Sequence, residues 1–204
     1  MLLVVGGQAR KTGKTSLTAG LIRRLRRHRW TALKITQYGR TPCSRHKGPE
    51  SCECAPPEGA EFALTEEYTP GATDSGRFLA AGAVRSFWLQ APAGELPRAA
   101  SLLRKVLAQG ENVIVESTSL VELVKPDLFL MLLDFGCQDF KDSSLRFIDR
   151  ADAFVVVDRG INAPLWEGVA AGVWDHKPRF LIEPPPWVTP QLADFVEAKL
   201  AAAR

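Results

Sequence analysis

Near its start the chain carries a segment of residue types that bind phosphate. It runs from Gly6 to Ser16 and reads Gly-Gly-Gln-Ala-Arg-Lys-Thr-Gly-Lys-Thr-Ser. Consecutive backbone N–H groups in such a segment can surround a polyphosphate at the positive end of the following helix. Lys14 would neutralise the charge of the β- and γ-phosphates, and the Thr15 hydroxyl would ligate Mg²⁺. The residues that we expect to contact the nucleotide are Gly7, Arg10, Lys11, Thr12, Gly13, Lys14, Thr15 and Ser16.

The flanking sequence has the order strand, loop, helix that a phosphate-binding loop requires. The apolar run Leu2–Val5 precedes the loop, and a helical pattern of apolar residues follows it from Leu17 to Leu25. We therefore predict that the chain binds a nucleoside triphosphate. For Arg10 and Lys11, three interpretations stay open: they add positive charge to the phosphate site, they reach the nucleotide of a partner subunit, or they are solvated loop cations.

The spacing within this loop is irregular. Five residues separate Gly7 from Gly13, whereas the common motif G-x-x-x-x-G-K-[ST] would place a glycine at Gln8. The longer spacing resembles that of dethiobiotin synthetase and of the cobyrinate amidation enzymes. Those proteins belong to a branch of P-loop proteins that includes many metabolic ATPases.

Two carboxylates are candidates to complete a magnesium site. Glu116 follows the apolar residues Val113–Val115, where an unpaired carboxylate is costly. We expect it to bind Mg²⁺, directly or through water, and to activate an attacking group; the alternative is a strand-end side chain in solvent. Asp74 is the second candidate, although either Asp74 or Thr73 could cap the helix that begins there. Arg77 opposes the dipole of that helix and therefore needs a phosphate or carboxylate partner.

Pro70–Ala83 reads P-G-x-x-D-S-x-R-x-x-x-A-G-A. Together with the early phosphate loop and the strand that ends in Glu116, it resembles the B-type accessory protein of molybdopterin-guanine-dinucleotide biosynthesis. That resemblance implies a SIMIBI-type P-loop fold that binds GTP and Mg²⁺, assists molybdenum cofactor maturation and forms homodimers. It gives catalytic or nucleotide roles to Lys14, Asp74 and Glu116. The chain departs from the family pattern at Ser117, where the family has glycine, and after the second strand, where the family is rich in histidine.

The rest of the chain alternates short apolar runs with helical patterns. This alternation predicts an α/β fold of the P-loop NTPase type: one domain over residues 1–204, with a mainly parallel sheet and helices on both faces. Ligands in such sheets bind at the carboxyl ends of the strands. The expected strands are Leu2–Val5, Thr31–Thr36, Ala83–Leu89, Asn112–Glu116, Asp127–Leu133, Ala153–Val157 and Arg179–Ile182. The expected helices are Lys14–Arg29, Ser75–Gly82, Leu96–Ala108, Leu145–Arg150, Leu165–Ala171 and Pro190–Ala203.

A cysteine-rich insertion at about 38–73 has no clear periodicity, and long structureless segments of this kind are usually functional or mobile. Its Cys43, His46, Cys52 and Cys54 could supply the four nitrogen and sulfur ligands of a structural Zn²⁺ ion. The alternatives are a mobile loop with free thiols or an iron–sulfur site. The insertion leaves the second strand beside the phosphate loop, so it could also dock a partner protein.

Composition restricts the class of protein. The chain has 204 residues, of which 46% are hydrophobic and 24% charged, and its net charge of +3 is too small to favour nucleic-acid binding. No run approaches the length of a membrane span, and the apolar N-terminus is expected to be a core strand rather than a signal peptide. We expect a cytoplasmic protein without a membrane partner.

The sequence leaves the base and the reaction open. It contains no N-K-x-D guanine motif, although Asp158 and Pro184–Trp187 follow late strands and could approach the base. The first hypothesis is a magnesium-dependent protein that binds and slowly hydrolyses GTP or ATP. The second is an ATP-dependent ligase of the dethiobiotin-synthetase type. The third is a non-catalytic module in which the nucleotide switches partner binding.

Overall fold

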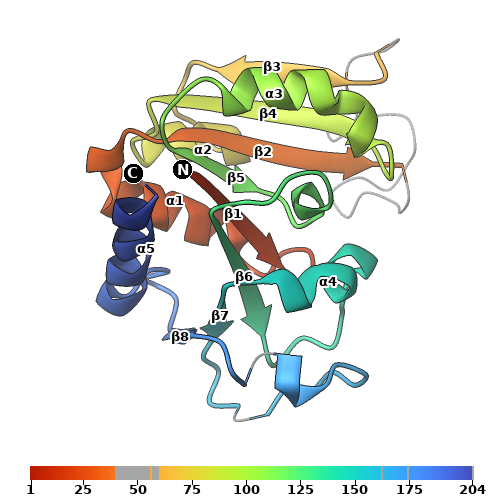
Figure 1. Cartoon of the computed structure of the whole chain (residues 1–204), viewed down its shortest axis with the longest axis vertical. Coiled ribbons are helices and arrows are strands. Elements are labelled where there is room, and N and C mark those ends of the chain that lie inside the picture. Colours follow the sequence, from red (N-terminus) through yellow and green to blue (C-terminus); the bar gives the residue numbers. More distant parts are fainter. Residues whose placement is uncertain (40–55, 57–59, 162, 174, 204) are drawn as a thin grey trace.

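The protein is described by a computed structural model that covers residues 1–39, 56, 60–161, 163–173 and 175–203. Its centre is a sheet in the order β3-β4-β2-β5-β1-β6-β7-β8 (Figure 1). Every neighbouring pair is parallel except β3 and β4. The strands are β1 (Leu2–Gly7), β2 (Thr31–Tyr38), β3 (Ala63–Glu67), β4 (Arg85–Pro92), β5 (Val113–Glu116), β6 (Leu128–Asp134), β7 (Ala153–Val157) and β8 (Arg179–Ile182).

Helices cover both faces of this sheet, and Figure 1 shows α3 in front of it and α2 behind it. One apolar cluster joins α1, α2 and α5 to one face, and a second joins α3 and α4 to the other. Strands with buried residues on both faces need such double cover, so the predicted α/β class is confirmed. The helices are α1 (Lys14–Arg24), α2 (Asp74–Ala80), α3 (Ala100–Leu107), α4 (Asp142–Phe147) and α5 (Pro190–Ala202).

The register of the central strands positions the candidate site. Glu116, at the end of β5, lies level with Val5 of β1 on one side and with Lys34 of β2 on the other. The carboxyl ends of β1 and β5 therefore meet beside the middle of β2, where the chain leaves β1 for the loop before α1. This is the edge of the sheet at which the sequence predicted ligand binding.

Two predicted helices differ from the structure. No helix covers Leu165–Ala170, and only a short 3₁₀ turn follows at Ala171–Val173. The apolar residues there anchor a loop instead, because Trp166 packs edge-on against Phe135 with ring centroids 5.2 Å apart. The first helix ends at Arg24 rather than Arg29, since the Trp30 indole N–H donates to the Leu25 carbonyl at 3.1 Å and turns the chain.

The segment expected to be aperiodic contains an edge strand that sequence reasoning missed. β3 runs antiparallel to β4, and the Arg85 guanidinium of β4 pairs with the Glu66 carboxylate of β3 at 2.7 Å. Its five residues lack the apolar alternation of a half-buried strand, and an ion pair supplies part of the contact instead. In the described part of the chain, no helix has the length and hydropathy needed to cross a membrane.

Candidate functional site

The loop between β1 and α1 is shaped by Gly13, which has φ +101° and lies directly before the first residue of the helix. A helix begins with N–H groups that have no partner within the helix. Here those groups belong to the residues around Lys14 and Thr15, at the carboxyl end of the sheet. The loop and the helix start together form the backbone arrangement that binds phosphate.

Gly13 also allows a close contact with the segment after β8. A Cβ atom at Gly13 would lie 2.0 Å from the Trp187 ring.

We expect Gly13→Ala to lower the free energy of unfolding by about 2 kcal/mol more than Gly82→Ala, because it adds a clash to the strain of a positive φ. Gly82 is a matched control, since its φ is +104° and a Cβ atom there would lie 3.7 Å from its nearest neighbour. Urea unfolding of both variants measures the difference, and equal losses would contradict the contact.

Lys14 lies over the loop. Its ammonium donates to the Ala9 carbonyl at 2.6 Å and to the Thr12 hydroxyl at 3.4 Å. Burial, assisted by the nearby charge of Lys141, lowers the pKa of Lys14 to about 7. The ammonium is thus held in a buried place where its charge is only partly compensated, and a bound anion would restore that compensation.

Oxygen ligands gather beside the loop. The Thr15 hydroxyl donates to the Glu116 carboxylate at 2.8 Å, and the Glu116 side chain is only 2% exposed. The Lys34 ammonium binds the second Glu116 oxygen and lies 3.1 Å from the Asp74 carboxylate. Burial alone would lower the pKa of Lys34, but Glu116 and Asp74 outweigh that effect and raise it. Two carboxylates therefore bind one resident cation, and the Thr15 hydroxyl binds one of these carboxylates.

Lys34 was missed by sequence reasoning, although the sequence carries a signal for it. Leu33 and Ile35, its neighbours in β2, are both buried. A lysine between such residues in the middle of a parallel strand needs a carboxylate partner, because a buried unpaired charge is costly.

The helix α2 brings Asp74 to the site. Thr73 is the cap of this helix, since its hydroxyl accepts from the Gly76 N–H at 3.0 Å. Asp74 is therefore not needed as a cap and pairs with Lys34. The Arg77 guanidinium donates to the Ser16 hydroxyl at 2.9 Å and lies 3.9 Å from Asp74, which connects the two helix starts.

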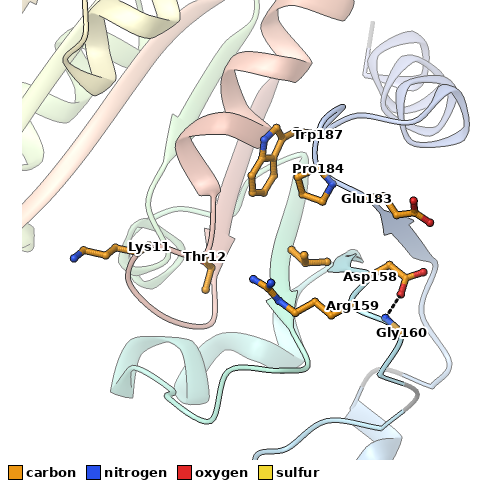
Figure 2. Close-up of a pocket in the computed structure, with 9 residues that line it drawn as sticks. Lys11, Thr12, Asp158, Arg159, Gly160, Glu183, Pro184 and Trp187 are labelled. Atoms are coloured by element: carbon orange, nitrogen blue, oxygen red, sulfur yellow. Dashed lines mark hydrogen bonds between the residues drawn. The ribbon is translucent and has the colours of Figure 1, made fainter.

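The other predicted loop residues take different positions. Gly7 lies so close to Lys14 that a Cβ atom would be 2.8 Å from the lysine side chain. Arg10 and Lys11 are exposed, and Lys11 has φ +60°. Thr12 is buried and donates to the Ala9 carbonyl at 3.2 Å. Lys11 and Thr12 also line a neighbouring pocket, although Figure 2 shows the Lys11 side chain pointing away from it.

This pocket has a volume of about 620 Å³ and lies beside the ends of β7 and β8. In Figure 2, Trp187 and Pro184 lie on one side of it and Thr12 and Arg159 on the other. The Arg159 guanidinium is held by two hydrogen bonds of 2.7 and 2.9 Å to the Asp134 carboxylate. A flat aromatic ring and a fixed guanidinium are surfaces on which a nucleobase can stack.

The proposed zinc ligands Cys43, His46, Cys52 and Cys54 lie outside the described residues. Within the described ranges, no three histidine, cysteine or acidic side chains are arranged as a metal-binding group. The zinc site stays a prediction from the sequence.

No family model and no curated protein matches the sequence. Among solved structures, LpxK from Aquifex aeolicus in complex with ATP is similar with a TM-score of 0.49 and 18% identity, covering 88% of this chain and 53% of that chain. HypB from Helicobacter pylori in complex with nickel is similar with a TM-score of 0.48 and 15% identity, covering 98% of this chain and 87% of that chain. The present chain thus spans about half of the LpxK chain, and likenesses of this size identify no family.

Proposed function

We propose that the protein binds a magnesium–nucleoside triphosphate, GTP or ATP, in the loop after β1 and hydrolyses it slowly. The observation that carries this proposal is the 2.8 Å contact between Thr15, at the start of α1, and the buried Glu116 at the end of β5. This contact places a hydroxyl and a carboxylate next to a loop whose lysine lacks a full counter-charge. Phosphate and Mg²⁺ are the ligands that such a combination of groups favours.

Each residue has a role in this proposal. Lys14 exchanges the Ala9 carbonyl for the β- and γ-phosphates. Thr15 and Glu116 would hold Mg²⁺, with assistance from Asp74, and the metal would neutralise charge that develops on the phosphates. The present position of the Lys34 ammonium between the two carboxylates supports this assignment, because the same oxygens already bind a cation.

Slow hydrolysis follows from the hydrogen bonds of Glu116. Its two oxygens are bonded to Thr15 and Lys34 and would also hold Mg²⁺, so this carboxylate positions cations rather than accepting a proton from an attacking water. General-base catalysis needs a group within hydrogen-bond reach of the nucleophile. The base of the nucleotide occupies the pocket beside Trp187, and its identity as guanine or adenine stays open in this proposal.

The resemblance seen in the sequence supports a more specific role as a homodimeric accessory protein of molybdenum cofactor biosynthesis, with a partner docking at residues 38–73. A single domain over 1–204 and a cytoplasmic location belong to the same proposal. Turnover separates it from the two alternatives. Slow hydrolysis without a further substrate supports the accessory protein, substrate-dependent use of ATP supports a ligase, and binding without turnover supports a nucleotide-switched module.

The test is calorimetric titration with MgGTP and MgATP at pH 7 and pH 9, followed by phosphate-release assays. We expect binding of at least one nucleotide, with an affinity that falls between these pH values. Phosphate requires the charged form of Lys14, whose pKa in the nucleotide-free site is about 7, so each higher pH unit costs at most about tenfold in affinity. If neither MgGTP nor MgATP binds, the proposal is contradicted.

A further inference from the structure

Gln8, the residue that breaks the common loop spacing, is fully buried and bonded at both ends of its side chain. Its Oε1 accepts from the Asp134 N–H at 2.9 Å, and its Nε2 donates to the carbonyls of Cys137 and Asp139. Its backbone N–H donates to the Leu132 carbonyl at 3.0 Å. A glycine could make none of the side-chain bonds. The residue that makes the spacing irregular therefore attaches the segment after β6 to the phosphate loop.

The attached segment ends at Lys141. The Lys141 N–H donates to the Gln8 carbonyl at 3.0 Å, which fixes the lysine backbone against the loop. One helical turn later, the Ser144 hydroxyl donates to the Gly7 carbonyl at 2.7 Å. Lys141 is thus connected from two sides to the residues that form the phosphate loop.

Among the described residues, the charge of Lys141 is compensated only in part, by the more distant Glu116. Its ammonium has neither an ion pair nor a hydrogen bond within those residues, whereas Lys34 has two carboxylate partners. Burial and then the charges of Arg10 and Lys34 lower the pKa of Lys141 to about 8. Arg10 and Lys34 carry the same charge as Lys141 and repel it. This arrangement favours an anion between the three cations.

The position of the pocket gives the direction of the nucleotide. The pocket lies at β7 and β8, on one side of β1, whereas Lys34 and Glu116 lie on β2 and β5, on the other side. With the base beside Trp187, the phosphate chain runs along the loop towards Lys34. The backbone of Lys141 is bonded to the loop at Gln8, and the charges of Arg10, Lys34 and Glu116 all act on its ammonium, which puts this group within electrostatic reach of the phosphate chain.

We propose that Lys141 binds the terminal phosphate of the nucleoside triphosphate, and that Gln8 is the positioning residue that holds Lys141 there. This inference depends on the proposed nucleotide binding. It adds a phosphate ligand from the segment after β6, which the pattern of the loop alone does not indicate. It also gives the site a means of distinguishing triphosphates from diphosphates.

The experiment compares MgGTP, MgGDP, MgATP and MgADP in calorimetric titrations of the wild type, Lys141→Met, Lys141→Arg and Gln8→Ala. We expect Lys141→Met to weaken triphosphate binding by about tenfold, the loss of one charged hydrogen bond, and to change diphosphate binding by less than about twofold. Lys141→Arg retains the charge and should retain most of the preference. Gln8→Ala removes no charge, yet it should reduce the same preference. Lys125→Met, at an exposed lysine between η3 (Ser119–Glu122) and β6, is the control for nonspecific charge.

The outcomes separate this inference from the proposed function. A wild type that binds no nucleotide contradicts both. A wild type that binds, with a Lys141→Met variant that keeps the full triphosphate preference, contradicts the role of Lys141 alone. Thermal unfolding supplies the second measurement: because the Lys141 ammonium lacks a described partner, Lys141→Met should melt no lower than the wild type. A lower melting temperature together with equal losses for triphosphate and diphosphate would assign Lys141 a structural role instead.

Discussion

Replacing Lys14 with methionine is expected to weaken the binding of MgGTP or MgATP by about ten- to hundredfold. The side chain supplies charged hydrogen bonds to phosphate, each worth about 1.5–3 kcal/mol, and methionine supplies none. Calorimetric titration measures the loss. The same variant should bind with a smaller dependence on pH between 7 and 9, because the group whose pKa is lowered to about 7 has been removed and Lys141, with a pKa of about 8, still titrates there.

A folding defect is distinguished from this loss by the stability of the nucleotide-free variant. Lys14 is half-buried and its charged form is disfavoured there, so Lys14→Met should unfold at the wild-type temperature or above it. Lys105→Met, at an exposed position on α3, serves as the control and should bind as the wild type does. Equal affinities of wild type and Lys14→Met would count against the phosphate-loop assignment.

Replacing Glu116 with alanine is expected to lower the free energy of unfolding by about 3 kcal/mol and to abolish magnesium-dependent nucleotide binding. The Glu116 carboxylate is 2% exposed, and its removal leaves the Lys34 ammonium with one partner in place of two. Breaking a buried ion pair by removal of one member is costly because the other charge stays buried. Urea unfolding measures the first effect, and titration with and without Mg²⁺ measures the second.

Two further variants identify the cause of that instability. Lys34→Met combined with Glu116→Leu removes both charges and should recover most of the lost stability without recovering binding. Glu122→Ala breaks the exposed pair with Arg146, at 3.1 Å, and should cost less than about 0.5 kcal/mol. If the double variant were as unstable as Glu116→Ala, the loss would come from packing rather than from the unpaired ammonium.

The α/β fold could be predicted from the sequence because the apolar runs and helical patterns alternate along the chain. β1, β5, β6 and β7 consist of buried residues on both faces, and such runs have no other stable environment in a protein of this size. The false helix at Leu165–Ala171 has a different explanation. Its Trp166 packs against Phe135 and Phe140 from a loop, and an apolar residue in a loop looks the same in sequence as one in a helix.

The candidate site could be predicted only where one residue type implies one chemistry. Lys14, Thr15 and Glu116 belong to such patterns, and the structure brings all three to one edge of the sheet. Lys34 and Lys141 do not: the apolar neighbours of Lys34 indicate that it needs a carboxylate but not which one, and a lysine in a turn is usually solvated. Their importance depends on the register between β2 and β5 and on the bonds of Gln8, which are contacts between residues far apart in the chain.

The resident ammonium of Lys34 has a consequence for how the site responds to ions in the cell. Two carboxylates that share a site repel each other and attract any divalent cation in solution. With Lys34 between them, Glu116 and Asp74 are already neutralised in part, so the site can stay folded without a metal and has little attraction for free Mg²⁺. A metal ion that arrives with the phosphates brings its own ligands and can compete with the lysine. If the protein binds the nucleotide as proposed, the lysine makes the site selective for the metal–nucleotide complex over the metal ion alone.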